Sequence, residues 1–199
     1  MWEKKLFIFC VSILCLGFTA TEKQEIAAKH IHQIKKGVLL VRLHQHKAVL
    51  DKLKYHGQDV EHKKKKEEIE RFNKSIYEAL SRVYDFSNME FFYAENSKNV
   101  RLGKLDGVFL NDAFMADSSI VVDSSVPRYI LEVGDIIFPS MSGHQNGLAV
   151  LNAQFEPLES PFPYYVKRSG GFFIKRTDTD MAIMLNNQFQ SFYNKYPLN

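Results

Sequence analysis

Two pairs of histidines mark the first third of the chain, and imidazole nitrogens are common metal ligands. His30 and His32 are two residues apart, as are His44 and His46. Side chains two apart share a face in a strand but not in a helix. His44 and His46 would therefore chelate a metal only if the preceding strand extends through them, and no acidic residue or cysteine accompanies them at close spacing. Exposed histidines at helix ends are the interpretation that we favour.

A second group of reactive residue types lies in and before PSMSGHQNG, Pro139 to Gly147. His144 is a candidate base, Ser142 a candidate nucleophile and Asp135 a candidate orienting carboxylate, which together suit a serine hydrolase. The frames that usually present such a serine, G-x-S-x-G and S-x-x-K, are absent. A polar hairpin loop with glycines in its turns explains the same residues, and we prefer it to the hydrolase.

Lys63 to Lys66 form a run of four cations, which would suit a polyanion because clustered cations release its counterions. Acidic residues at four-residue spacing favour instead a solvated helix face with internal ion pairs, and an anionic surface partner is the alternative. Aromatic side chains for base stacking are missing from the stretch, so we expect no nucleic-acid partner. The expected pairs are Glu61 with Lys65, Lys63 with Glu67, Lys64 with Glu68 and Lys66 with Glu70.

The chain begins with the pattern of a secretory signal peptide. Lys4 and Lys5 supply positive charge, an apolar run follows from Leu6 to Phe18, and small residues lead to Ala20, after which we expect cleavage. The apolar run is shorter than the roughly 20 residues that cross a bilayer. We therefore expect a periplasmic or secreted protein with no permanent membrane anchor after cleavage.

Both cysteines, Cys10 and Cys15, lie in the segment that we expect to be removed. The exported chain then has no disulfide, no catalytic thiol and no cysteine-ligated zinc site. Walker A, dinucleotide-binding, H-E-x-x-H and EF-hand patterns are also absent. We expect no cofactor.

Charge divides the remaining chain into two parts of one domain. Residues 22–82 carry 15 Lys and Arg against 9 Asp and Glu, a net charge of +6, whereas residues 83–199 carry 9 against 13, a net charge of −4. The sequence therefore predicts a signal peptide at 1–20 and a single α+β domain at 21–199. Its basic part, 21–86, is rich in helices and its second part, 87–199, is rich in strands.

The expected elements follow from hydrophobic periodicity. Apolar residues at helical spacing alternate with one nearly continuous apolar run, VLLVRL, in the first part, and short runs separated by turn residues fill the second. We predict N-terminal helices with a long helical hairpin and one early strand, then a largely antiparallel sheet and a C-terminal helix. Expected helices are Glu22 to Lys36, Lys47 to Tyr55, Gln58 to Tyr84 and a last one from Thr177 or Asp178 to Tyr196. Expected strands are Val38 to Leu43, Met89 to Ala94, Gly107 to Leu110, Ser119 to Val122, Arg128 to Phe138, Gly147 to Phe155, Tyr164 to Lys167 and Gly171 to Ile174.

The signal peptide, the segment GVLLVRL after a helix ending at Gly37, and FFYAENSKNVRLGKLDGVFLND resemble uncharacterised exported proteins of Bacteroidota-type bacteria. The resemblance implies an exported address and carries no activity or site residue. Export, an aromatic-rich sheet and the missing catalytic frames lead us to expect a non-enzymatic binding protein whose partner is an envelope protein or glycan. The hydrolase with His144 and the metal binder with His44 and His46 are the alternatives.

Overall fold

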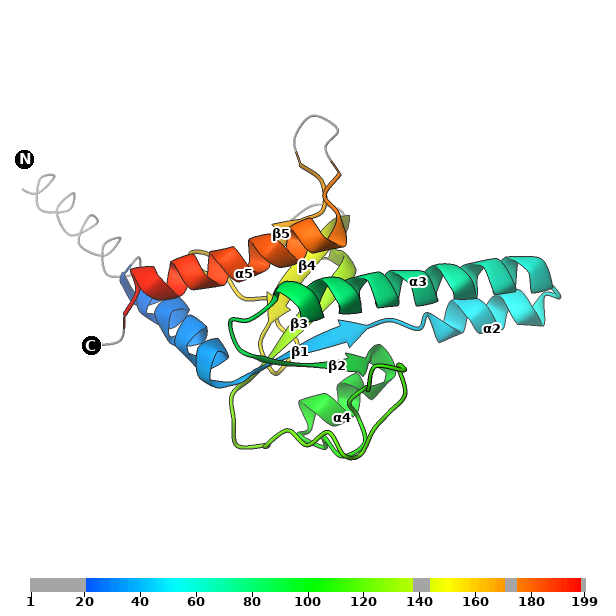
Figure 1. Ribbon diagram of the computed structural model, residues 1–199, viewed down its shortest axis with the longest axis horizontal. Helices are drawn as coiled ribbons and strands as arrows, with labels where there is room; N and C mark the ends of the chain where they lie inside the picture. Colours follow the sequence, from blue (N-terminus) through cyan, green and yellow to red (C-terminus); the bar gives the residue numbers. More distant parts are fainter. Residues whose placement is uncertain (1–20, 138–143, 171–174, 198–199) are drawn as a thin grey trace, which may run out of the picture.

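The chain has the predicted α+β fold, and a computed structural model describes it over residues 21–137, 144–170 and 175–197 (Figure 1). The predicted signal peptide, residues 1–20, lies outside the described residues, together with Cys10 and Cys15. The strand expected at Gly171 to Ile174 also falls outside them.

One mixed sheet of five strands occupies the centre, in the order β2-β1-β3-β4-β5. The early strand β1 is parallel to β2 on one side and to β3 on the other. The expected antiparallel pairing holds for β4, which runs antiparallel to both β3 and β5. The strands are β1 Val38–Leu43, β2 Asn88–Tyr93, β3 Arg128–Ile137, β4 His144–Leu151 and β5 Tyr165–Lys167.

Helices connect and cover these strands where the sequence shows a period of 3.6 residues. The parallel pair β1 and β2 needs a crossover connection, and the helical hairpin of α2 and α3 supplies it. The short helices η1 and α4 follow β2 and were not predicted. The helices are residues 21–36, α2 Lys47–Tyr55, α3 Asp59–Val83, η1 Ala94–Asn96, α4 Ser97–Arg101 and α5 Asp178–Lys195.

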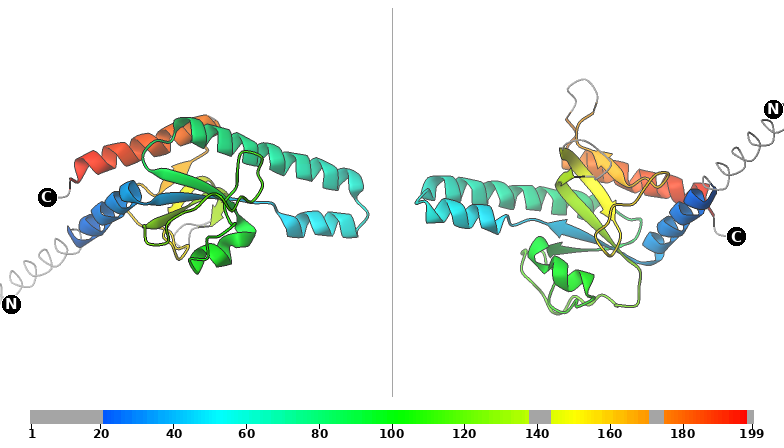
Figure 2. Two further views of the ribbon diagram at one scale, coloured as in Figure 1. Left: turned by 60° about the horizontal axis from the view of Figure 1, so that its bottom comes forward. Right: turned by 180° about the vertical axis from the view of Figure 1, so that it is seen from behind.

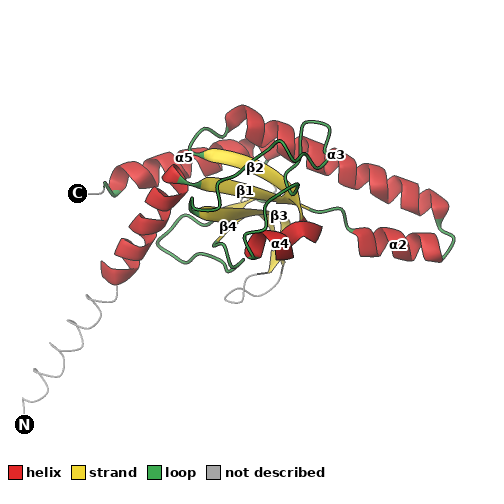
Figure 3. Cartoon of the chain, turned by 90° about the horizontal axis from the view of Figure 1, so that it is seen from below, coloured by secondary structure: helices red, strands yellow, loops and turns green. Residues whose placement is uncertain are grey.

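The sheet has an apolar core on each face. Helix 21–36, α3 and α5 cover one face (Figures 2 and 3), where Ile31, Phe86 and Phe189 are fully buried. α4 and residues 102–127 cover the other face, over Leu40 and Ile130. Both faces of β1 are therefore buried, which explains why its sequence is apolar at nearly every position.

Two helix ends depend on particular residues. Thr177 begins α5 with a capping box, in which its hydroxyl accepts from the Asp180 amide at 3.1 Å and the Asp180 carboxylate accepts from the Thr177 amide at 2.9 Å. Gly37 ends the first helix for a reason of packing. A Cβ at Gly37 would lie 2.1 Å from the carbonyl oxygen of Pro127, so a larger residue cannot fit.

Two predicted strands, Gly107 to Leu110 and Ser119 to Val122, are wrong. The first contributes only isolated bridges at Phe109 and Leu110, and the second lies in turns and coil. Asp117 accepts a hydrogen bond from the amide of Ser119 at 2.9 Å, a local turn that competes with strand pairing. Most of their apolar side chains still pack in a core, Leu110 in the first and Val108, Phe109, Ile120 and Val122 in the second, whereas Val121 is 81% exposed. The pattern therefore marked burial at most positions but not backbone pairing.

Candidate functional site

The residues proposed for a hydrolase lie at the far end of the β3–β4 pair. β4 begins at His144, opposite Ile137, three residues before the predicted strand start at Gly147, so the predicted loop is wrong for His144, Gln145 and Asn146. Asp135 accepts a hydrogen bond from the side-chain amide of Asn146 at 2.8 Å. Ser142 lies outside the described residues. The described contact of Asp135 is therefore with a cross-strand amide.

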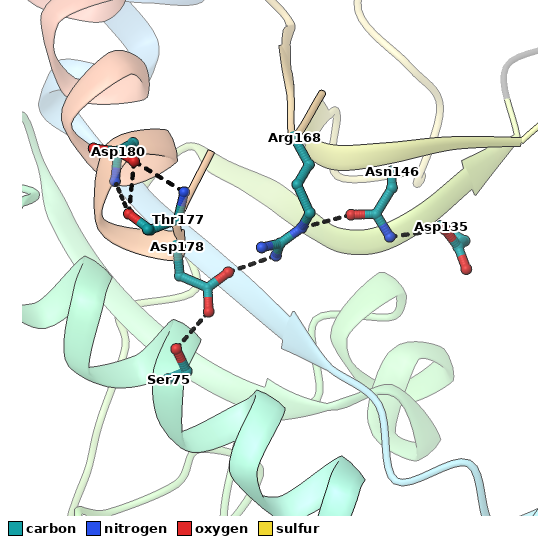
Figure 4. A network of polar contacts seen from close by, with 7 residues as sticks. All are labelled: Ser75, Asp135, Asn146, Arg168, Thr177, Asp178 and Asp180. Carbon is teal, nitrogen blue, oxygen red and sulfur yellow. Dashed lines mark hydrogen bonds and ion pairs between the residues drawn. The ribbon is translucent and has the colours of Figure 1, made fainter. Parts of the chain in front are cut away.

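Asn146 leads into a polar network that ties four elements together (Figure 4). Its side-chain oxygen accepts from Nε of Arg168 at 2.7 Å, and Arg168 forms an ion pair of 2.5 Å with Asp178 in the first turn of α5. Ser75 of α3 donates to the same Asp178 carboxylate. The side chains of Arg168 and Asp178 are only 14% and 12% exposed. Because the charges balance and a carboxylate suits a helix N-terminus, we interpret this network as a structural clamp.

The histidine pair His44 and His46 does not extend β1, which ends at Leu43. His46 is the residue before α2 and has a left-handed backbone with φ of 48°. The two rings stack with centroids 5.6 Å apart. The expectation of exposed histidines at helix ends is incomplete, because His44 Nε2 lies 2.5 Å from a carboxylate oxygen of Glu132 on β3.

Glu132 also binds Arg42, its register partner on β1, with Arg42 Nη1 2.8 Å from the other carboxylate oxygen. Arg42, Glu132 and His44 thus form an ion triad on the central strands, and Glu132 is only 8% exposed. Sequence reasoning missed it because His44 and Glu132 are 88 residues apart. The available signal was a charged residue within an apolar run in each case, Arg42 in VLLVRL and Glu132 in RYILEVGDIIF.

Opposing effects set the charge of Glu132. Burial favours the neutral acid, but the hydrogen bond with His44 and the charge of Arg42 outweigh it, so the pKa of Glu132 lies below its usual value. The Arg42 guanidinium also lies 5.5 Å above the ring of Phe155, while its buried Nε has no partner among the described residues. Both oxygens of Glu132 are engaged, so the triad is arranged to hold two strands and the start of α2.

The α2–α3 hairpin, residues 47–66, is the other unusual feature, and it projects well beyond the sheet (Figures 1 and 2). α2 has no buried residue, and the buried residues of α3 begin only at Ile69. Seven lysines and three carboxylates give the hairpin a net charge of +4 with neutral histidines. Apolar groups are exposed beside the turn, with Tyr55 86% and Val60 78% accessible.

Ion pairing on the hairpin is sparser than predicted. Only one of the four expected pairs forms, Lys66 with Glu70 at 3.8 Å. Lys65 binds Glu68 instead, at 3.2 Å. Within the described residues the other five hairpin lysines have no ion pair: Lys47, Lys52, Lys54, Lys63 and Lys64.

Within residues 21–137, 144–170 and 175–197, no group of three or more His, Asp, Glu or Cys side chains is arranged to hold a metal ion. No helix in the same ranges has the length and apolar character needed to cross a bilayer. Comparison of the chain with protein-family models, curated proteins and solved structures finds no match.

Proposed function

We propose that this is an exported, non-enzymatic binding protein of the cell envelope, and that its α2–α3 hairpin binds an anionic membrane surface. One observation carries the proposal: five lysines that have no ion pair with any described residue lie on a projecting arm whose first helix buries no residue. Such an arm places its cations away from the folded body without burying them. A partner of opposite charge would explain this arrangement.

Lipid headgroups suit the hairpin better than a polymer because the turn combines cations with apolar groups. A lysine near an anionic bilayer contributes about 1 kcal/mol, so several together give reversible and salt-sensitive binding. Tyr55 and Val60 are exposed next to these lysines. A tyrosine ring is favourable at the level of the headgroups, where one end of the ring is apolar and the other is wet.

The test uses the exported form, residues 21–199, with vesicles of zwitterionic lipid alone or mixed with anionic phosphatidylglycerol. We expect sedimentation with the anionic vesicles only, and loss of binding when salt rises from about 0.05 M to about 0.5 M. Lys63→Glu/Lys64→Glu should abolish it. Lys98→Glu/Lys104→Glu makes the same charge change on exposed residues outside the hairpin and should bind nearly as well as wild type.

Two results would contradict the proposal: equal binding by the hairpin variant and wild type, or equal binding to both kinds of vesicle. Binding of a soluble polyanion with no vesicle binding would assign the hairpin to a polymer instead. The hydrolase and metal-binding alternatives gain no support from the described contacts, since Asp135 bonds to Asn146 and His44 bonds to Glu132.

A further inference from the structure

β2 is an edge strand of the sheet (Figure 3). A groove follows its free side. The groove has a volume of about 780 Å³ and lies between α3, β2 and residues 110–120. α3 forms its wall on one face of the sheet, and the segment around Ile120 forms its wall on the other. The groove therefore straddles the edge of β2, where an added strand would lie.

The backbone of β2 has unused hydrogen-bonding groups on this side. The carbonyl of Phe91 accepts from the amide of Leu110 at 2.9 Å, so the backbone groups of Phe91 point away from β1. Alternate residues of a strand direct their N–H and C=O groups to the same side, which places those of Met89 toward the groove. No described residue pairs with the Met89 groups there. The other end of this edge is occupied, because Phe92 forms an antiparallel bridge with Phe109. The unpaired part around Met89 is a template for another extended chain.

Charge indicates what kind of chain fits. Three carboxylates line the groove, those of Glu90, Asp112 and Asp117, and no lysine or arginine does. Glu90 is half-buried and has no hydrogen bond or ion pair with a described residue. Burial accordingly raises its pKa, since nothing compensates the lost solvation of the carboxylate. An arriving cation would supply the missing partner.

The two walls of the groove are held together by contacts of Tyr77. The hydroxyl of Tyr77 donates to Asp112 at 2.5 Å, which joins α3 to the 110–120 segment. The Tyr77 ring also packs against Phe91 with centroids 4.5 Å apart and against Phe114 at 5.2 Å. The groove is thus open but preformed, and binding there requires little rearrangement of the protein.

We propose that the edge of β2 binds an extended basic peptide segment of a partner protein by strand addition, with a lysine or arginine of the peptide paired to Glu90. Main-chain hydrogen bonds supply affinity in this mode and alternate side chains supply specificity. A second copy of this chain fits less well, because two-fold pairing of β2 with itself would bring two Glu90 carboxylates close together. This site is separate from the lysines of the hairpin.

The experiment measures binding of a fluorescent peptide of alternating valine and lysine by anisotropy, at constant ionic strength. Three peptides are compared: the basic peptide, its valine and glutamate counterpart, and the basic peptide with its central amide nitrogens methylated. We expect binding of the first only. Methylation removes backbone donors and leaves every charge in place, so equal binding of the methylated peptide would overturn strand addition.

Variants then assign the site on the protein. Glu90→Gln should lower the affinity for the basic peptide by about fivefold to thirtyfold, as expected for loss of one charge-assisted contact. Glu78→Gln removes an exposed carboxylate of α3 outside the groove and should leave affinity unchanged. Lys63→Glu/Lys64→Glu should also leave it unchanged, which separates this site from the proposed membrane contact. Equal affinity of Glu90→Gln and wild type for the basic peptide would overturn the proposal. So would a dimer of this chain, detected by sedimentation, whose formation competes with peptide binding.

Discussion

Replacing Glu132 with leucine should destabilise the protein strongly, because it leaves the Arg42 guanidinium without its carboxylate. Glu132 supplies the ion-pair acceptor of Arg42 at 2.8 Å and of His44 at 2.5 Å. Removing one partner of a fully buried pair costs about 3–5 kcal/mol. The Arg42 side chain is 26% exposed and keeps part of its solvation. We therefore expect a loss of about 2–3 kcal/mol in the free energy of unfolding.

Urea unfolding followed by circular dichroism measures this change as a lower midpoint at constant slope. In a chain of this size the loss corresponds to a melting temperature lower by about 5–10 °C. Arg42→Met/Glu132→Leu removes both charges and should recover most of the loss, because no buried ion is left unpaired.

Glu78→Leu is the matched control. It breaks the exposed Lys74–Glu78 pair at 3.8 Å, whose side chains are 66% and 63% accessible, and it should cost less than about 0.5 kcal/mol. The reasoning is refuted if Glu132→Leu is as mild as this control, or if the double variant is less stable than Glu132→Leu alone.

Two further predictions concern stability. Burial, reinforced by Lys29 at His30 and by His44 at His46, lowers the pKa of both His30 and His46 below 6.5 in the folded chain. The unfolded chain then binds more protons, so unfolding free energy should decrease as pH falls below about 6.5, and His30→Gln/His46→Gln should flatten that slope in urea titrations. A slope unchanged in the double variant would contradict this. Thr177→Ala removes the N-cap of α5 and should cost about 1 kcal/mol, whereas Thr177→Ser should cost less than half of that.

Local sequence patterns were sufficient to predict those helices and strands whose bounds are set by residues within or next to the element. β1 has the predicted bounds, since its continuous apolar run is buried on both faces, and α2 does so because His56 and Gly57 end it. The periodicity of α3 gave its length to within a residue at each end. Thr177 and Asp178 were both N-cap candidates from their residue types, and the structure has the cap at Thr177.

Features that depend on strand order could not be predicted in the same way. The triad requires β1 to pair with β3 in the register that places Arg42 opposite Glu132, and nothing near either residue specifies that pairing. The free edge of β2 has the same origin, because it exists only once β1 has taken its place between β2 and β3. Residues 102–127 cover one core through turns, so their apolar residues were mistaken for strands.

A probe at the tip of the hairpin tests the central claim most directly. Residues 21–199 contain no cysteine, so in this form of the chain Gln58→Cys can carry a single environment-sensitive fluorophore at the exposed turn, and Lys104→Cys carries the same probe on the body. With phosphatidylglycerol vesicles at low salt, we predict a blue shift and increased emission at position 58 and none at position 104. Equal responses at the two positions, or no response at position 58, would contradict a membrane-binding hairpin.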